Sequence, residues 1–348
     1  MRERPGFASR AAPCAAALLA AGCALALSAA CAPRNPGAEL GTDPDLVVWT
    51  SHPEELVEAA RSEFEDRSGL RLEVRRGGTG ELLALLRSGA EGRPDVFWGG
   101  GAESLAACAD LFEPYRSPEA AAIPDALRDV AWRWTGFSML PTVLVYNARL
   151  VEPGREPRSW KALADPDLRG LVAFADPRIS GSAFTALATV EAAMGAAFVE
   201  RFAANLDGRL REESRAVFAA VASGECLVGA SFENGALEAL RFGTDLRFSY
   251  PDEGTSLVPD GIALVAGAKR PLAARAFIDF ALGPDLARVA AFRYGRRSAR
   301  SDAPPPRGAL PLESLRSIAY DIAAQAAGRE ALIARFVAAV EGAGGAAR

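Results

Sequence analysis

Residues 46–55 read Leu-Val-Val-Trp-Thr-Ser-His-Pro-Glu-Glu, and this stretch predicts a strand that turns directly into a helix. The apolar run 46–49 suits a buried strand, and the small polar residues 50–52 suit a turn. Pro53 suits the first turn of a helix, and the two glutamates after it favour the positive helix end. We therefore expect polar groups where a strand ends and a helix begins.

The same order of strand, polar turn and helix recurs along the chain. Residues 70–74 alternate apolar and polar, residues 77–80 read Gly-Gly-Thr-Gly, and residues 95–98 form the next apolar run. Further strand candidates lie at residues 143–146, 171–175, 226–231, 246–250 and 262–265. Strands that alternate with helices predict an α/β fold with mixed, mostly parallel sheets. Past residue 270 the patterns are helical, so we expect a helical C-terminus.

The N-terminal residues have the composition of an export signal. Arg2, Arg4 and Arg10 precede an apolar, alanine-rich run over residues 11–30. Residues 27–31 read Leu-Ser-Ala-Ala-Cys and resemble a bacterial lipobox, in which Cys31 is the lipidated residue; Cys23 is the rival cleavage point. We predict a signal peptide at 1–30, a polar tether at 31–45, and a lipid anchor that holds the chain in the periplasm or at the cell surface.

Composition and motifs argue against several function classes. The formal net charge is −5, which disfavours nucleic acid as a partner. His52 is the only histidine, and no paired cysteines have metal-ligand spacing, so we predict no resident metal or other cofactor. Neither a nucleophile elbow nor a Walker or dinucleotide loop is present, so we do not expect an enzyme. Cys108 and Cys226 lie in apolar segments, and we expect both to be free thiols.

Five predicted turns carry hydroxyl, amide or glycine groups next to a helix start. In open α/β sheets, ligands bind beyond the carboxyl ends of the strands, where backbone N–H groups and hydroxyls form a seat for an anion. Arg178 is placed to add a charge-assisted hydrogen bond to that anion. The candidate ligand-binding residues are Thr50, Ser51, His52, Thr79, Gly80, Gly100, Gly101, Arg178, Ser180, Gly181, Ser182, Glu233, Asn234 and Asp260.

Several longer segments resemble the ferric-type branch of the extracellular solute-binding proteins of ABC importers, which have the type II periplasmic-binding-protein fold. They include VVWTSHPEE at 47–55, PDVFWGGGAES at 94–104, SWKAL at 159–163, FADPRISGSA at 174–183 and YPDEGT at 250–255. The resemblance implies two α/β lobes joined by a hinge, a ligand in the cleft, and an ABC permease that recognises the closed form. The implied lobes are 46–142 with 261–315, and 143–260 with 316–340, followed by a frayed tail at 341–348.

The resemblance leaves the ligand open. Ferric binders of this family hold the metal with two adjacent tyrosines, where this sequence reads Ser-Phe-Glu-Asn-Gly at 231–235. Other branches carry phosphorylated sugars or aminoalkylphosphonates, which suit hydroxyls and helix starts. We predict a monomer that captures an organic phosphate or phosphonate. The alternative is ferric iron, held by His52 and Glu233 together with a bound anion. A ligand sensor or a periplasmic enzyme on the same scaffold remain as further alternatives.

Overall fold

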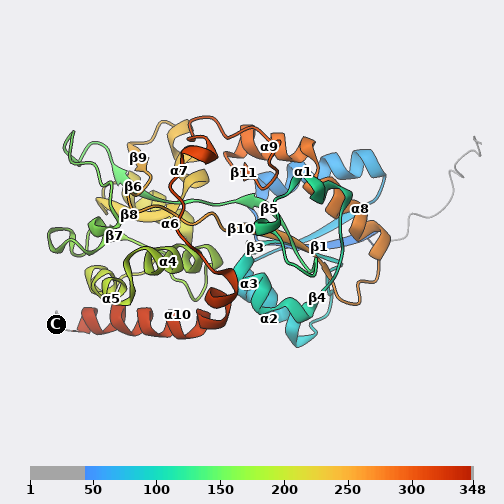
Figure 1. The fold of residues 1–348 in the computed structure, drawn as a ribbon, viewed down its shortest axis with the longest axis horizontal. Helices are drawn as coiled ribbons and strands as arrows, with labels where there is room; N and C mark the ends of the chain where they lie inside the picture. Colours follow the sequence, from blue (N-terminus) through green and yellow to red (C-terminus); the bar gives the residue numbers. More distant parts are fainter. Residues whose placement is uncertain (1–43, 346–348) are drawn as a thin grey trace, which may run out of the picture. The chain divides into compact units, whose positions relative to one another are not determined.

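The computed structural model describes residues 44–345, whose strands form two mixed sheets covered by helices (Figure 1). The mixed α/β class and the helical C-terminus are therefore confirmed. The predicted signal peptide, Cys31 and the tether up to residue 43 lie outside the described residues. Within residues 44–345, no helix has the length and hydropathy that a membrane span needs.

The first sheet has the strand order β11-β5-β10-β3-β1-β2, with β4 also paired to β10. Its strands are β1 (Leu46–Thr50), β2 (Leu72–Arg76), β3 (Val96–Gly101), β4 (Phe112–Glu113), β5 (Thr135–Met139), β10 (Pro259–Val265) and β11 (Arg297–Ser298). The helices around it are α1 (Glu54–Ser68), α2 (Thr79–Ser88), α3 (Ala102–Ala107), α8 (Pro271–Leu282) and α9 (Pro284–Tyr294).

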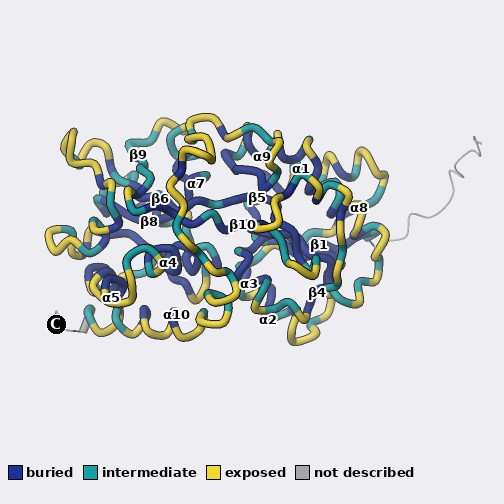
Figure 2. Tube along the Cα trace, viewed as in Figure 1, coloured by how far each residue is buried: buried dark blue, intermediate teal, exposed yellow. Residues whose placement is uncertain are grey.

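This sheet is buried on both faces. Because alternate residues of a strand point to opposite faces, Leu46 and Val48 pack in the cluster under α1 and α8, while Val47 and Trp49 pack under α2. Figure 2 shows β1 and β10 buried between helices whose outer surfaces are exposed. The short helices of the chain are η1 (Ala109–Leu111), η2 (Pro118–Ala122), η3 (Asp125–Leu127), η4 (Trp160–Ala164), η5 (Pro166–Leu168) and η6 (Leu312–Ser314).

The second sheet has the strand order β7-β8-β6-β9. Its strands are β6 (Thr142–Asn147), β7 (Val172–Ala173), β8 (Val228–Phe232) and β9 (Leu246–Ser249). Its helices are α4 (Gly181–Met194), α5 (Ala196–Asn205), α6 (Ser214–Ala222), α7 (Glu233–Arg241) and the C-terminal α10 (Ile322–Gly345). One face packs on Phe184, Phe202 and Phe336 from α4, α5 and α10. The other face packs on α6 and α7.

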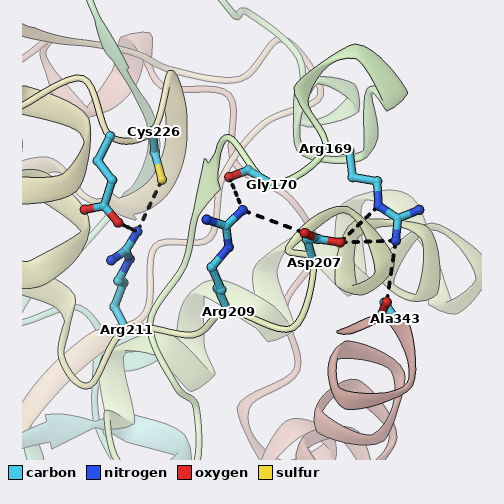
Figure 3. A network of polar contacts seen from close by, with 8 residues as sticks. Arg169, Gly170, Asp207, Arg209, Arg211, Cys226 and Ala343 are labelled. Atoms are coloured by element: carbon cyan, nitrogen blue, oxygen red, sulfur yellow. Dashed lines mark hydrogen bonds and ion pairs between the residues drawn. The ribbon is translucent and has the colours of Figure 1, made fainter. Parts of the chain in front are cut away.

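A polar network lies beside the end of α10 (Figure 3). Arg169 Nε donates to Asp207 Oδ1 at 3.2 Å, and Arg209 donates to the Gly170 carbonyl at 2.8 Å. Arg211 lies 3.5 Å from the sulfur of Cys226. Among the described residues 44–345, Cys108 and Cys226 are both free cysteines, as predicted.

Strand direction departs from the prediction of mostly parallel sheets. The pairs β1–β2, β1–β3 and β7–β8 are parallel, whereas β10 runs antiparallel to β3, β4 and β5, and β6 runs antiparallel to β8 and β9. The reason is topological. The chain leaves the first sheet after β5 through residues 140–141 and returns after β9 through residues 250–258. It therefore re-enters at the carboxyl ends of β1 and β3, so β10 must run against them. The lobe boundaries given above stay a prediction.

Candidate functional site

A cavity of about 690 Å³ lies between the two sheets and is lined by residues from both. From the first sheet it takes the turns that follow β1 and β2 and the last residues of β3, and from the second it takes the starts of α4, α6 and α7. The predicted site residues that line it are Ser51, His52, Thr79, Gly100, Gly101, Ser180, Gly181, Ser182, Asn234 and Asp260. Turns far apart in sequence are thus brought to one place.

Glycines allow the turns from the two sheets to approach closely. Gly100 has a φ of 83°, and a Cβ there would lie 2.6 Å from Thr79 Cγ2. A Cβ on Gly181 would lie 3.1 Å from Thr79 Cβ, and a Cβ on Gly78 would lie 3.3 Å from the Ile179 carbonyl oxygen. The starts of α2 and α4 therefore touch across the cavity, and larger side chains would hold them apart.

Three serine hydroxyls form a triangle on the second-sheet wall. Ser180 Oγ lies 2.9 Å from Ser182 Oγ and 3.1 Å from Ser214 Oγ, and Ser182 Oγ lies 3.0 Å from Ser214 Oγ. Ser180 caps α4 by accepting a hydrogen bond from the Ala183 N–H, whereas α6 begins at Ser214 without a side-chain cap. Sequence reasoning missed Ser214, although a serine at the start of a helix is a recognisable sequence signal.

Three arginines line the cavity, and sequence reasoning identified none of them. Arg76 lies 3.0 Å from Glu54, and Arg215 of α6 lies 3.4 Å from Glu55 of α1. The second contact joins the two walls of the cavity. Arg296 forms a buried ion pair with Asp260.

His52 and Asp260 lie close together in a buried part of the cavity lining. His52 Nδ1 lies 3.9 Å from Asp260 Oδ2, and the imidazole ring packs 4.5 Å from the Trp98 ring. Burial, and then the charge of Arg296, lower the pKa of His52 well below its ordinary value, so the ring is neutral at physiological pH. Burial raises the pKa of Asp260, while Arg296 and two hydrogen bonds from Ser138 act in the opposite direction.

Two of the predicted residues, Thr50 and Gly80, lie outside the cavity lining. The Thr50 hydroxyl accepts a hydrogen bond from the His52 N–H at 3.1 Å and shapes the turn after β1. Gly80 lies in the first turn of α2, where an added Cβ would be 3.9 Å from the Arg178 carbonyl oxygen.

Arg178 and Glu233, two charged residues that were predicted to contact the ligand, also lie outside the lining, and each side chain has another partner. Arg178 folds back onto Asp176, with its Nε 3.0 Å from Oδ1, and also lies 3.5 Å from Glu341. Glu233 forms a bidentate ion pair with Arg297 at 2.7 and 2.8 Å and accepts a hydrogen bond from the Tyr250 hydroxyl. Neither Arg178 nor Glu233 lines the cavity, and their roles as ligand contacts stay a prediction.

Three tryptophans near the ends of first-sheet strands belong to the core. Trp49 and Trp98 are 1% exposed and Trp134 is 4% exposed, and none of them lines the cavity. The cavity instead includes Phe218 and Phe232, together with the carboxylates of Glu212, Glu213 and Glu238. Within residues 44–345, no group of three His, Cys, Asp or Glu side chains is arranged to hold a metal ion.

Comparison with known proteins gives matches over most of the chain. The model of the family described as bacterial extracellular solute-binding protein matches residues 46–297. The structure of the periplasmic binding protein AfuA from Actinobacillus pleuropneumoniae, with exogenous fructose 6-phosphate bound, is 25% identical with a TM-score of 0.78. That match covers 85% of this chain and 98% of AfuA.

Two further relatives are named for iron. The ferric binding protein from Campylobacter jejuni shares the fold, with 18% identity, a TM-score of 0.73, and coverage of 86% of this chain and 99% of that one. The Fe(3+)-binding periplasmic protein of Serratia marcescens is 30% identical over 49% of this chain and 48% of its own length. The chain shares the type II periplasmic-binding-protein fold with the AfuA and Campylobacter jejuni structures. Because the family model matches residues 46–297, the chain belongs to the bacterial extracellular solute-binding proteins.

Proposed function

We propose that this solute-binding protein captures an organic phosphate or phosphonate in the cavity and delivers it to an ABC permease. Family membership supports the transport role, because solute-binding proteins of importers carry a small ligand to a permease. The observation that carries the choice of ligand is the serine triangle of Ser180, Ser182 and Ser214 at the starts of α4 and α6.

The serine triangle has the chemistry of a binding site for a phosphoryl group. Hydroxyl groups rotate, so three neighbouring hydroxyls can each donate a hydrogen bond to the oxygens of one anion. Two helix starts add backbone N–H groups and partial positive charge at the same place. The fructose 6-phosphate in the AfuA structure supports a sugar phosphate as the first ligand to test.

The remainder of the cavity suits the rest of an organic ligand. A volume of about 690 Å³ is in the range of small-molecule sites and far exceeds a single ion. Glu213 and Glu238 line it and have no ion-pair partner among the described residues, so they are available to accept hydrogen bonds from ligand hydroxyls or an amine. Phe218 and Phe232 add apolar surface for the carbon skeleton.

Ferric iron is the second candidate, because a relative with 30% identity is named as an Fe(3+)-binding periplasmic protein. His52 and Asp260 lie close together in the lining. However, Glu233 is held by Arg297, and no tyrosine among residues 44–345 lines the cavity. Iron would therefore need cavity carboxylates and a bound anion to complete its ligands.

We further propose that the protein acts as a periplasmic monomer tethered through lipidated Cys31. In this proposal the two lobes keep the bounds 46–142 with 261–315, and 143–260 with 316–340. Mass spectrometry of the membrane fraction tests the anchor, because a diacylated N-terminal cysteine is expected at residue 31 and Cys31→Ser releases the protein.

The ligand proposal is tested by isothermal titration calorimetry with fructose 6-phosphate, 2-aminoethylphosphonate, inorganic phosphate and ferric citrate. We expect a phosphoryl compound to bind, and Ser182→Ala with Ser214→Ala to weaken its binding at least tenfold, because hydrogen bonds to charged groups contribute about 1.5–3 kcal/mol each. These two serines are chosen since neither caps a helix. Ser223→Ala, at the far end of α6, is the matched control. Binding of ferric citrate alone, or unchanged affinity in the double variant, would contradict the proposal.

A further inference from the structure

We propose that Glu54 and Glu55 are built-in competitors of the ligand for Arg76 and Arg215, and that they thereby lower the affinity of the cavity for anions. This inference rests on the proposed phosphoryl ligand. Both glutamates belong to the first turn of α1, and neither was among the predicted site residues.

The pairing of the cavity arginines carries the argument. Each of the three arginines that line the cavity lies beside a carboxylate: Arg76 by Glu54 at 3.0 Å, Arg215 by Glu55 at 3.4 Å, and Arg296 by Asp260. The guanidinium charges that line the cavity are therefore already matched. An entering anion must share or displace a carboxylate before it gains an arginine.

Burial separates the pairs that can exchange from the one that cannot. Arg296 and Asp260 are 6% and 3% exposed, and Ser138 donates two more hydrogen bonds to Asp260. Breaking such a pair leaves an uncompensated buried charge. Arg76 and Glu54 are 44% and 71% exposed, and Arg215 and Glu55 are 55% and 60% exposed. Exposed pairs contribute little to stability, so these two arginines can turn to a ligand.

Glu55, which competes with the ligand for Arg215 in this proposal, also forms a contact between the two walls of the cavity. Its contact with Arg215 joins α1 of the first sheet to α6 of the second, whereas the Arg76–Glu54 contact stays within the first-sheet wall. Separation of the walls breaks the Arg215–Glu55 pair, and approach of the walls restores it. The carboxylate that competes with the ligand is therefore also one side of a contact between the two walls.

A purely structural role for the two glutamates predicts the opposite sign of effect. Acidic residues in the first turn stabilise a helix through its dipole, so their loss would leave anion binding unchanged or weaker. Competition predicts that their loss makes binding tighter. The sign of the affinity change therefore separates the two roles.

The test compares the wild-type protein with the variant Glu54→Gln, Glu55→Gln in calorimetric titrations with fructose 6-phosphate and with inorganic phosphate. At about 20 mM NaCl we expect about three- to tenfold tighter binding in the variant, and at about 500 mM NaCl the difference should largely vanish because salt screens exposed charges. Glu58→Gln is the matched control on the same helix, since Glu58 lies 3.6 Å from Arg61 and does not line the cavity. Its affinity should equal that of the wild type.

A second comparison ties the effect to the arginines. The substitutions Glu54→Gln and Glu55→Gln are also made in a protein that carries Arg76→Gln and Arg215→Gln. There they should increase the logarithm of the affinity by at most half of the increase seen in the wild-type background, because the two arginines for which the glutamates compete are gone. Equal or weaker binding by the glutamate variant, or a full gain in the arginine-free background, would overturn the inference while leaving the proposed function standing. If neither the wild type nor the variant binds either phosphoryl probe, the proposed function fails with it.

Discussion

The buried ion pair between Glu233 and Arg297 predicts a large effect of a small chemical change. Glu233 is the first residue of α7 on the second sheet, and Arg297 lies in β11 of the first sheet. Their side chains are 1% and 3% exposed and share two hydrogen bonds at 2.7 and 2.8 Å. Glu233→Gln keeps the shape but leaves the buried guanidinium without its counter-charge. Removal of one partner of such a pair costs about 3–5 kcal/mol of unfolding free energy.

The assay is urea unfolding followed by tryptophan fluorescence, which reports on the buried Trp49 and Trp98. Asp245→Asn is the matched control, because Asp245 and Arg149 form an ion pair at 3.2 Å whose side chains are 46% and 76% exposed. The control should lose less than about 1 kcal/mol. Arg297→Gln added to Glu233→Gln should recover at least half of the loss, since no charge then remains unpaired. If Glu233→Gln loses no more than the control does, the pair does not carry the stability assigned to it here.

Two further predictions follow from other residues. The pKa of His52 is lowered in the folded protein, so below about pH 6.5 the unfolded chain binds a proton that the folded protein does not. The free energy of unfolding therefore falls by up to about 1.4 kcal/mol for each unit by which the pH is lowered below that point. Urea titrations at pH 7.5 and 5.5 should show a smaller loss for His52→Gln, and an equal loss in wild type and variant would refute this prediction. Gly100→Ala should destabilise more than Gly154→Ala, because both have positive φ but only Gly100 would meet Thr79. Thr79→Ser removes the contacted methyl group and should restore part of the loss, so equal stabilities of the three variants would refute the steric argument.

Local patterns predicted most of the fold because they report burial. The run at residues 46–49 is a strand because both of its faces are covered, and residues 50–52 follow it as a polar turn. The same patterns say nothing about strand direction. The antiparallel course of β10 depends on where the chain returns from the second sheet, which no local window contains.

The candidate site likewise contains residues that local sequence patterns predict and residues that they do not. Turn residues such as Ser51 and Ser182 were predictable, because a ligand site in an α/β fold lies where strands end. Arg215 and Ser214 were missed because the sequence does not show that the start of α6 faces the cavity, where Arg215 meets Glu55 of α1. The pairing of Glu233 with Arg297, 64 residues away, could not be predicted because no local pattern in the sequence contains both residues.

The position of β10 also has a consequence for biosynthesis. This strand, Pro259–Val265, lies between β3 and β5, although both of those strands are made more than a hundred residues earlier. Until β10 leaves the ribosome, β3 and β5 each present an unpaired edge, and the whole second sheet must emerge first. Unpaired strand edges on a growing chain invite wrong pairings and aggregation. Among the strands of the first sheet, only the two-residue β11 is made after the central strand β10. The nascent chain therefore has to be kept from wrong strand pairing until β10 is available.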